Sequence, residues 1–255
     1  MYEHLLVKDE GDVTTITLNR PEKRNALSLD VMTELTAACR AAGESPALAV
    51  VLAANGPVFS AGHNFGDMAG VDVGAARRLF EVCVEMMDAI QAIPQPVVAK
   101  VHALATAAGC QLVATCDLAV ASEDAAFALP GGKGGLFCHT PLVGVSRNIG
   151  RKRALELAMT GEPIDARTAA EWGLVNRVVP ADRVDEETAS LVAAVTRGSA
   201  VQKGIGKQTY YAQIDLPQAE AYRHAVEVMA EGVVAPDGQE GIAAFLEKRK
   251  PRFRR

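Results

Sequence analysis

Alternation of short apolar segments with amphipathic ones between residues 13 and 121 is the feature that most constrains the fold. Four segments rich in β-branched or small apolar residues predict strands: Val13–Leu18, Ala49–Ala53, Pro96–Leu104 and Leu118–Ala121. Three segments between them have helical spacing: Ser28–Arg40, with Ser28 as the expected N-cap, Ala75–Ile93, which Pro94 should end, and Ala108–Thr115. Strands alternating with helices in this way predict an α/β fold.

The pattern becomes helical after residue 150. Five further helices are predicted: Arg151–Met159, Asp165–Trp172, Asp182–Thr196, Leu216–Glu231 and Asp237–Lys250. The last begins with a pattern like a capping box, with Asp237 as the cap and Glu240 three residues later. We therefore divide the chain into an α/β core over residues 1–195 and a helical C-terminal region over residues 196–255.

Composition excludes several classes of protein. The chain has 26 Lys and Arg against 31 Asp and Glu, a net charge of −5, which argues against general nucleic-acid binding. The longest apolar stretch, Ala47–Ala54, is far below the ~20 residues of a membrane span, and the acidic N-terminus does not resemble a signal peptide. Five cysteines without a C-x-x-C pair, and no H-E-x-x-H, predict neither disulfides nor a metal site. These features predict a cytoplasmic protein without metal.

Two glycine-lysine pairs invite a phosphate-loop interpretation, but neither fits. Gly206-Lys207 and Gly132-Lys133 both lack the earlier glycine and the following Ser or Thr of a P-loop. No G-x-G-x-x-G opens a helix after a strand, and no G-x-S-x-G is present. The sequence therefore argues against NAD and P-loop nucleotide chemistry.

Three segments, taken together and in this order, carry a family resemblance: Asn19–Leu27 (NRPEKRNAL), Val58–Met68 (VFSAGHNFGDM) and Val101–Asp117 (VHALATAAGCQLVATCD). They resemble the enoyl-CoA hydratase/isomerase (crotonase) superfamily, and Thr160–Pro180 fits the same family. The sequence is most similar to the enoyl-CoA hydratase domain-containing subgroup. The resemblance implies a crotonase-like spiral of β-β-α turns with a helical C-terminal oligomerisation region, assembled as a homotrimer or hexamer.

The resemblance also implies a substrate and a site. The substrate would be an acyl-CoA or enoyl-CoA thioester, with coenzyme A as part of the substrate and no tightly bound cofactor. By motif position, the backbone N–H groups of His63 and Ala108 would form an oxyanion hole for the thioester carbonyl. Candidate contacts to coenzyme A are Lys23, Arg24, Ala26 and Leu27, then His63, Asn64, Phe65 and Gly66 toward the adenine end, and the basic tail Lys248–Arg255 near the phosphates.

The chain departs from the family where hydratases carry two catalytic glutamates. By motif position, Gln111 and Gly131 stand there, and neither can exchange a proton near neutral pH. Gln111 could orient a water or a substrate amide. His139 occupies a slot where some relatives have a carboxylate, and we hypothesise that it transfers the proton.

Several functions stay open on this sequence. We expect an enzyme of fatty acid metabolism, a lyase or an isomerase, that stabilises an enolate or oxyanion without standard two-glutamate hydration. An isomerase, thioester hydrolase or decarboxylase fits the same residues. The alternative from another class is a non-catalytic acyl-CoA-binding or assembly protein.

Overall fold

The computed structural model describes residues 2–254. The strands are β1 (Leu5–Glu10), β2 (Val13–Leu18), β3 (Ala49–Ala54), β4 (Val97–Val101), β5 (Ala105–Thr106), β6 (Leu118–Ser122), β7 (Ala126–Ala128), β8 (Ile164–Asp165) and β9 (Arg177–Val179). The α-helices are α1 (Leu29–Glu44), α2 (Val73–Ala92), α3 (Ala108–Thr115), α4 (His139–Ser146), α5 (Arg151–Thr160), α6 (Ala166–Trp172), α7 (Val184–Val195), α8 (Ala200–Gln213), α9 (Gln218–Val234) and α10 (Pro236–Leu246).

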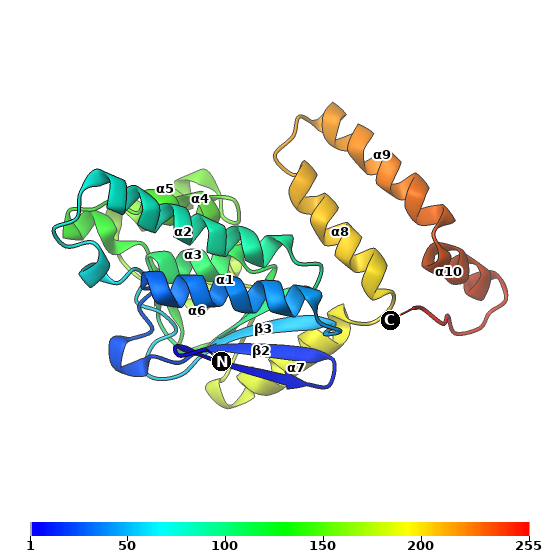
Figure 1. Cartoon of the computed structure of the whole chain (residues 1–255), viewed down its shortest axis with the longest axis horizontal. Coiled ribbons are helices and arrows are strands. Elements are labelled where there is room, and N and C mark those ends of the chain that lie inside the picture. Colours follow the sequence, from blue (N-terminus) through cyan, green and yellow to red (C-terminus); the bar gives the residue numbers. More distant parts are fainter. Residues whose placement is uncertain (1, 255) are drawn as a thin grey trace.

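The main sheet has the order β1-β2-β3-β4-β6-β9, antiparallel between β1 and β2 and parallel elsewhere. Strand β3 is apolar on both faces because both faces are covered. Val50 and Leu52 belong to the main core, which α1, α2 and α3 also form, whereas Ala49 and Val51 pack with α7 on the other face. Figure 1 shows α1 and α7 on opposite sides of the sheet. The predicted α/β class is confirmed.

Local sequence signals set the helix ends. The Ser28 side chain accepts a hydrogen bond from the Val31 N–H, as the N-cap prediction requires. Helix α2 is capped by Asp72, which accepts from the Ala75 N–H, and it ends two residues before Pro94. The predicted strand Pro96–Leu104 is too long, because the chain leaves the main sheet after Val101 and pairs again as β5 in a second sheet, β5-β7-β8.

The C-terminal helices extend away from the α/β body (Figure 1). Sequence reasoning missed α8, which begins at Ala200, shortly after the proposed division at residue 195. The predicted capping box at Asp237 is wrong: Pro236 is already the first residue of α10, so the helix starts earlier. Asp237 instead accepts hydrogen bonds from the Ser199 hydroxyl and the Arg254 N–H. The division of the chain after residue 195 stays a prediction.

A buried ion pair fastens α8 to the core. Lys207 Nζ lies 2.7 Å from an Asp117 carboxylate oxygen and donates to the Ile90 and Gln95 carbonyls, both at 2.9 Å. The Tyr211 hydroxyl donates to the other Asp117 oxygen at 2.8 Å. Burial raises the pKa of Asp117, and Lys207 opposes that rise. The charge of Asp117 therefore depends on its partners from α8.

We expect Lys207→Met to lower the free energy of unfolding by about 3–5 kcal/mol, because it leaves the Asp117 carboxylate buried and unpaired. Urea unfolding followed by circular dichroism measures this. Lys203→Met is the matched control on the same helix: Lys203 is exposed and its loss should cost under about 1 kcal/mol. Equal losses in the two variants would contradict the role of the buried pair.

Candidate functional site

Hydrogen bonds of Asn25 hold the loop after β2 against the segment that follows β3. Its side-chain amide donates to the Asn55 carbonyl at 2.7 Å and the Val58 carbonyl at 3.0 Å. The Ser60 hydroxyl donates to the Asn25 carbonyl at 2.8 Å. Asn25 has φ of 49°, a left-handed conformation that asparagine tolerates. Motif matching did not identify Asn25 as a structural residue of the site. The one indication in the sequence was its position inside the NRPEKRNAL segment.

The segment around His63 runs beside Leu27 as a short parallel bridge. The Leu27 N–H donates to the Gly62 carbonyl at 2.8 Å, and the Asn64 N–H donates to the Leu27 carbonyl at 3.2 Å. These two hydrogen bonds use the Gly62 carbonyl and the Asn64 N–H, which face Leu27. In a parallel bridge the N–H of the residue between them, His63, points away from Leu27. The structure thus leaves this N–H available on the other side of the loop.

The start of α3 supplies a second outward N–H group. Ala107, just before the helix, has φ of 52° and ψ of −120°, a conformation that is strained for alanine by about 1–3 kcal/mol. It is held by its N–H donating to the Ala128 carbonyl at 2.9 Å and its carbonyl accepting from the Gln111 N–H at 3.1 Å. Ala108 is the first residue of α3, so its N–H precedes the intrahelical hydrogen bonds.

Gly62 brings the loop of His63 against the start of α3. It has φ of +84°, and a Cβ at this position would lie 2.9 Å from the Ala107 Cβ and 3.1 Å from the Ala108 nitrogen. Only glycine permits both this conformation and this approach. The loop of His63 and the N-terminus of α3 are therefore in direct contact, where the helix dipole also favours negative charge. Such an arrangement can stabilise an oxyanion.

Gln111 lies one turn into α3 and is 5% exposed. Its Oε1 is buried and has no hydrogen-bond partner among residues 2–254, so it can accept a hydrogen bond from a group outside the chain. Its Cγ would lie 3.5 Å from a Cβ added at Gly144, so the side chain packs against α4. An amide in this place can orient a polar group but cannot act as a base.

Gly131 has no space for a side chain. A Cβ there would lie 2.1 Å from the Leu136 carbonyl oxygen and 2.7 Å from the Cys138 Sγ. The Gly131 N–H donates to that sulfur at 3.3 Å. The Cys138 thiol and the Leu136 carbonyl thus occupy the volume that a side chain would enter. Burial raises the pKa of Cys138, so the sulfur is held as a thiol.

His139 opens α4 and is exposed, with its ring tilted against Phe137 at a centroid distance of 5.1 Å. Its proposed proton transfer stays a prediction. Cys110 is fully buried, and burial raises the pKa of its thiol to about 12. Cys110 therefore packs in the main core as a thiol.

The predicted coenzyme A contacts are divided between exposed and buried positions. Lys23 and Arg24 are exposed, whereas Leu27 is buried and Ala26 half-buried. The Asn64 side chain accepts from the Gly66 N–H at 3.2 Å and so shapes the turn that carries Phe65, which is 79% exposed. The bridge between Leu27 and His63 brings both predicted contact segments side by side.

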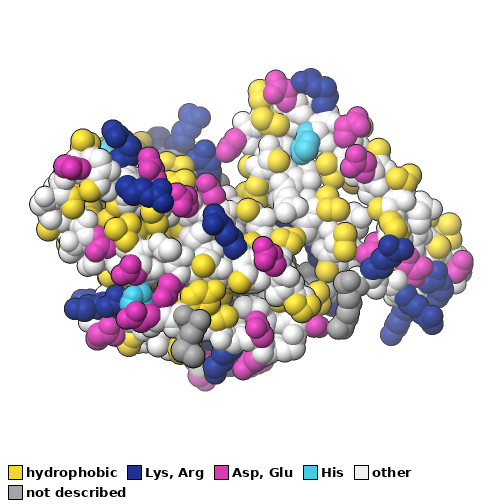
Figure 2. Space-filling model, in the orientation of Figure 1, with side chains coloured by type: hydrophobic (Ala, Val, Ile, Leu, Met, Phe, Trp, Pro, Cys, Tyr) yellow, Lys and Arg dark blue, Asp and Glu magenta, His cyan; other side chains and the backbone are white. Residues whose placement is uncertain are grey.

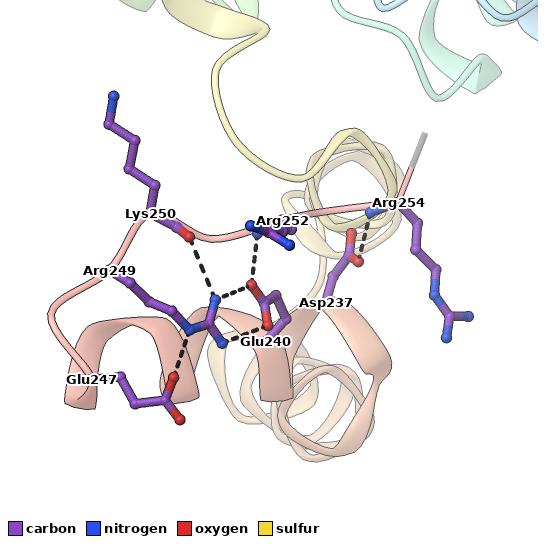
Figure 3. A network of polar contacts seen from close by, with 7 residues as sticks. All are labelled: Asp237, Glu240, Glu247, Arg249, Lys250, Arg252 and Arg254. Atoms are coloured by element: carbon purple, nitrogen blue, oxygen red, sulfur yellow. Dashed lines mark hydrogen bonds and ion pairs between the residues drawn. The ribbon is translucent and has the colours of Figure 1, made fainter.

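The basic tail folds back along α10 (Figure 3). The Arg249 guanidinium pairs with Glu240 at 2.6 Å and with Glu247 at 2.5 Å. The Arg252 N–H donates to Glu240 at 2.6 Å. The hydrogen bond from Arg249 lowers the pKa of Glu240 to about 2. Part of the tail's charge is therefore neutralised within the chain; Arg255 lies outside the described residues.

Within residues 2–254, no group of three or more His, Cys, Asp or Glu side chains is placed to hold a metal ion. Over the same range, none of the helices has both the length and the apolar character needed to cross a membrane.

Known proteins resemble the chain over almost its whole length. A crystal structure of enoyl-CoA hydratase from Mycobacterium smegmatis has a TM-score of 0.95 and 46% identity, covering 98% of each chain. The crystal structure of human enoyl-CoA hydratase domain-containing protein 3 has a TM-score of 0.94 and 39% identity, covering 98% of this chain and all of that one. The zebrafish (Danio rerio) protein of that name is 42% identical over 96% of this chain and 86% of its own.

These relatives contradict the predicted cytoplasmic location. The zebrafish and human proteins of the domain-containing 3 type are named as mitochondrial. Composition cannot separate a cytoplasmic protein from a protein of another cellular compartment, because proteins of both kinds have a similar share of charged residues.

A sequence model of the enoyl-CoA hydratase/isomerase family matches residues 8–255. The structural neighbours share the crotonase fold and its C-terminal helical region. The chain belongs to the enoyl-CoA hydratase/isomerase (crotonase) superfamily, within its enoyl-CoA hydratase domain-containing subgroup.

Proposed function

We propose that the chain acts on acyl-CoA thioesters and stabilises an enolate or oxyanion with the N–H groups of His63 and Ala108. The observation that carries this is the contact between the His63 loop and the start of α3 at Gly62. Both donors are backbone groups, so they do not depend on the side chains that differ from the family pattern. Each preorganised donor of this kind contributes about 10²–10³ in rate.

The coenzyme A moiety would lie along the two bridged segments. Lys23 and Arg24 offer exposed cations for its phosphates, and the exposed Phe65 ring offers a stacking face toward the adenine end. Ala26, which is half-buried and precedes the buried Leu27, borders the path of the pantetheine between them. This assignment requires no bound cofactor, since coenzyme A arrives as part of the substrate.

Standard two-glutamate hydration does not fit the site. Gln111 cannot take a proton from water, and Gly131 has no volume for a second acid. Reactions that depend chiefly on enolate stabilisation, namely isomerisation, thioester hydrolysis or decarboxylation, fit better. Gln111 would then orient a water or a polar group of the substrate with its buried Oε1.

Crotonyl-CoA turnover, measured with coenzyme A affinity by calorimetry on one preparation, tests this function. We expect micromolar coenzyme A binding with little hydration of crotonyl-CoA. Rapid hydration would contradict the loss of two-carboxylate chemistry. No coenzyme A binding would overturn the function itself. Binding without turnover of any acyl thioester would favour the non-catalytic acyl-CoA-binding role.

We further propose that α8–α10 pack against other copies of the chain. Helix α9 has no buried residue, and Tyr222, Val226, Met229 and Val234 are each more than 60% exposed. Figure 2 shows hydrophobic side chains among charged ones over these helices. Large apolar side chains exposed in this number along one helix are typical of an interface. A homotrimer or a hexamer would cover it.

We expect Val226→Glu combined with Met229→Glu to dissociate the assembly, because it places charges in the proposed interface. Light scattering after size-exclusion chromatography should show a trimer or hexamer for the parent chain and monomers for the variant. The control is Arg223→Glu with Glu227→Lys on the same helix, both exposed, which should leave the assembly intact. A monomeric parent chain would contradict the interface.

A further inference from the structure

The imidazole of His63 is a buried polar group whose hydrogen-bonding capacity is left unused by the described residues. Both ring nitrogens are buried, and neither has a partner at good hydrogen-bond geometry within residues 2–254, although the Leu27 carbonyl lies close enough to the ring to raise its pKa. The ring meets Phe80 of α2 edge-on, with centroids 5.3 Å apart and planes at 80°. A buried histidine normally pairs at least one nitrogen, because an unmade hydrogen bond costs free energy. The missing partner points to a group that is not part of the chain.

The backbone of His63 determines the part of the structure in which its ring lies. The N–H of the same residue faces the contact with α3, where the thioester oxygen is proposed to bind. The imidazole and this N–H belong to one residue, so a substrate held by the N–H would lie in the neighbourhood of the ring. Of the side chains on segments 60–64 and 105–111, the other titratable one is the Cys110 thiol, which is fully buried.

The surroundings keep the ring neutral. Burial lowers the pKa of His63 below its usual 6.5, and the Leu27 carbonyl and the Asp67 carboxylate oppose this only in part. The charged groups of α2 beside Phe80 are Arg77, Arg78, Glu81 and Glu85, which line an open groove with it. Arg78 pairs with Glu85 at 2.7 Å and lies 3.8 Å from Glu81. At pH 7 one ring nitrogen therefore keeps its lone pair.

We infer that the His63 imidazole is the proton-transfer group of this site and that its substrate is a 3-enoyl-CoA thioester. The inference rests on the proposed function. The free ring nitrogen takes a proton from the α-carbon. The C–H electron pair forms a double bond between the α-carbon and the carbonyl carbon, and the carbonyl π pair moves to the oxygen held by the two N–H groups.

The imidazolium then returns its proton to the γ-carbon. The electrons flow back from the oxygen, and the double bond moves from the 3,4 to the 2,3 position. The product is the 2-enoyl thioester, the imidazole is neutral again, and no water is consumed. One proton-transfer group is sufficient for this isomerisation, whereas hydration needs a base for water and an acid for the α-carbon. The site supplies one buried neutral base and no carboxylate at Gln111 or Gly131.

Replacing His63 with alanine separates the side chain from the backbone, because the variant keeps its N–H. The probe is 3-butenoyl-CoA, followed as it converts to crotonyl-CoA, with α-proton exchange of butyryl-CoA in D₂O measured by NMR. We expect His63→Ala to lower both rates by about 10²-fold or more and to leave coenzyme A affinity within about twofold. Added imidazole should restore part of the isomerisation. His4→Ala, a histidine that precedes β1 and belongs to none of these segments, is the matched control.

The pH profile provides an independent readout. Because the base must be neutral, kcat/KM of the parent chain should rise with pH through a midpoint below 6.5 and then stay level. His63→Ala should lose this limb. Unchanged isomerisation in His63→Ala, with coenzyme A still bound, overturns the inference and leaves the oxyanion site standing. A loss in His139→Ala without one in His63→Ala assigns the proton to His139. A parent chain that does not bind coenzyme A overturns both proposals.

Discussion

Replacing Gly62 with alanine should lower kcat/KM on the acyl-CoA substrate by about 10²–10³-fold. The new Cβ would lie 2.9 Å from the Ala107 Cβ and 3.1 Å from the Ala108 nitrogen, and φ of +84° is strained for alanine. The loop must shift, so the N–H groups of His63 and Ala108 no longer converge on one oxygen. Losing one such donor accounts for a loss of this size.

Steady-state kinetics and coenzyme A calorimetry on the same samples measure this effect. Coenzyme A affinity should change less than the rate, because the cations proposed to bind its phosphates, Lys23 and Arg24, lie on another loop. Gly206→Ala is the control: a Cβ there meets nothing within 4 Å, and the residue is inside α8. That variant should keep full activity. A Gly62→Ala enzyme with parent kinetics would show that the two N–H groups do not act on the substrate.

Restoring the second glutamate at Gly131 should destabilise the protein by about 3 kcal/mol and should not create a hydratase. A Cβ there would lie 2.1 Å from the Leu136 carbonyl oxygen and 2.7 Å from the Cys138 Sγ. The turn over Pro130–Gly134 must open to admit any side chain. Because Cys138 and Leu136 fill the space, a carboxylate cannot take its place beside a bound thioester.

Urea unfolding and crotonyl-CoA hydration test this on the single variant Gly131→Glu and on its combination with Gln111→Glu. Gly134→Glu, in the same turn, is the matched control, since a Cβ there meets nothing within 4 Å and the residue is exposed. It should keep the stability of the parent chain. The double variant would contradict this account if it hydrated crotonyl-CoA at a rate typical of enzymes. The turn would then accept a side chain, and the two missing glutamates alone would separate this chain from a hydratase.

Periodicity and capping predicted the elements that bury an apolar face. Helix α2 has seven buried residues spaced along one side, and its start and end were predicted to within two residues. Helix α8 was missed because its buried surface is small: Gly204 is its one fully buried residue, and Lys207 and Tyr211 attach it through polar contacts. Strands β5, β7 and β8 have only two or three residues each, too few for a repeating pattern.

The motifs predicted a backbone part of the site but not the contacts of its side chains. Matching His63 and Ala108 to the family pattern required only their places in two segments. The free ring of His63 and the filled space at Gly131 depend on contacts with Phe80, Leu136 and Cys138, which no spacing along the chain encodes. The same holds for Asn25, whose partners lie 30 and 33 residues away.

Isotope-edited infrared spectroscopy of bound crotonyl-CoA, labelled with ¹³C at the thioester carbonyl, tests the oxyanion hole most directly. Two N–H donors aimed at one oxygen polarise the C=O bond, so its stretching frequency should fall on binding. The shift should be lost in Gly62→Ala and kept in His63→Ala, which retains the backbone donors. A carbonyl frequency that is the same free and bound, with coenzyme A held tightly, would contradict the account.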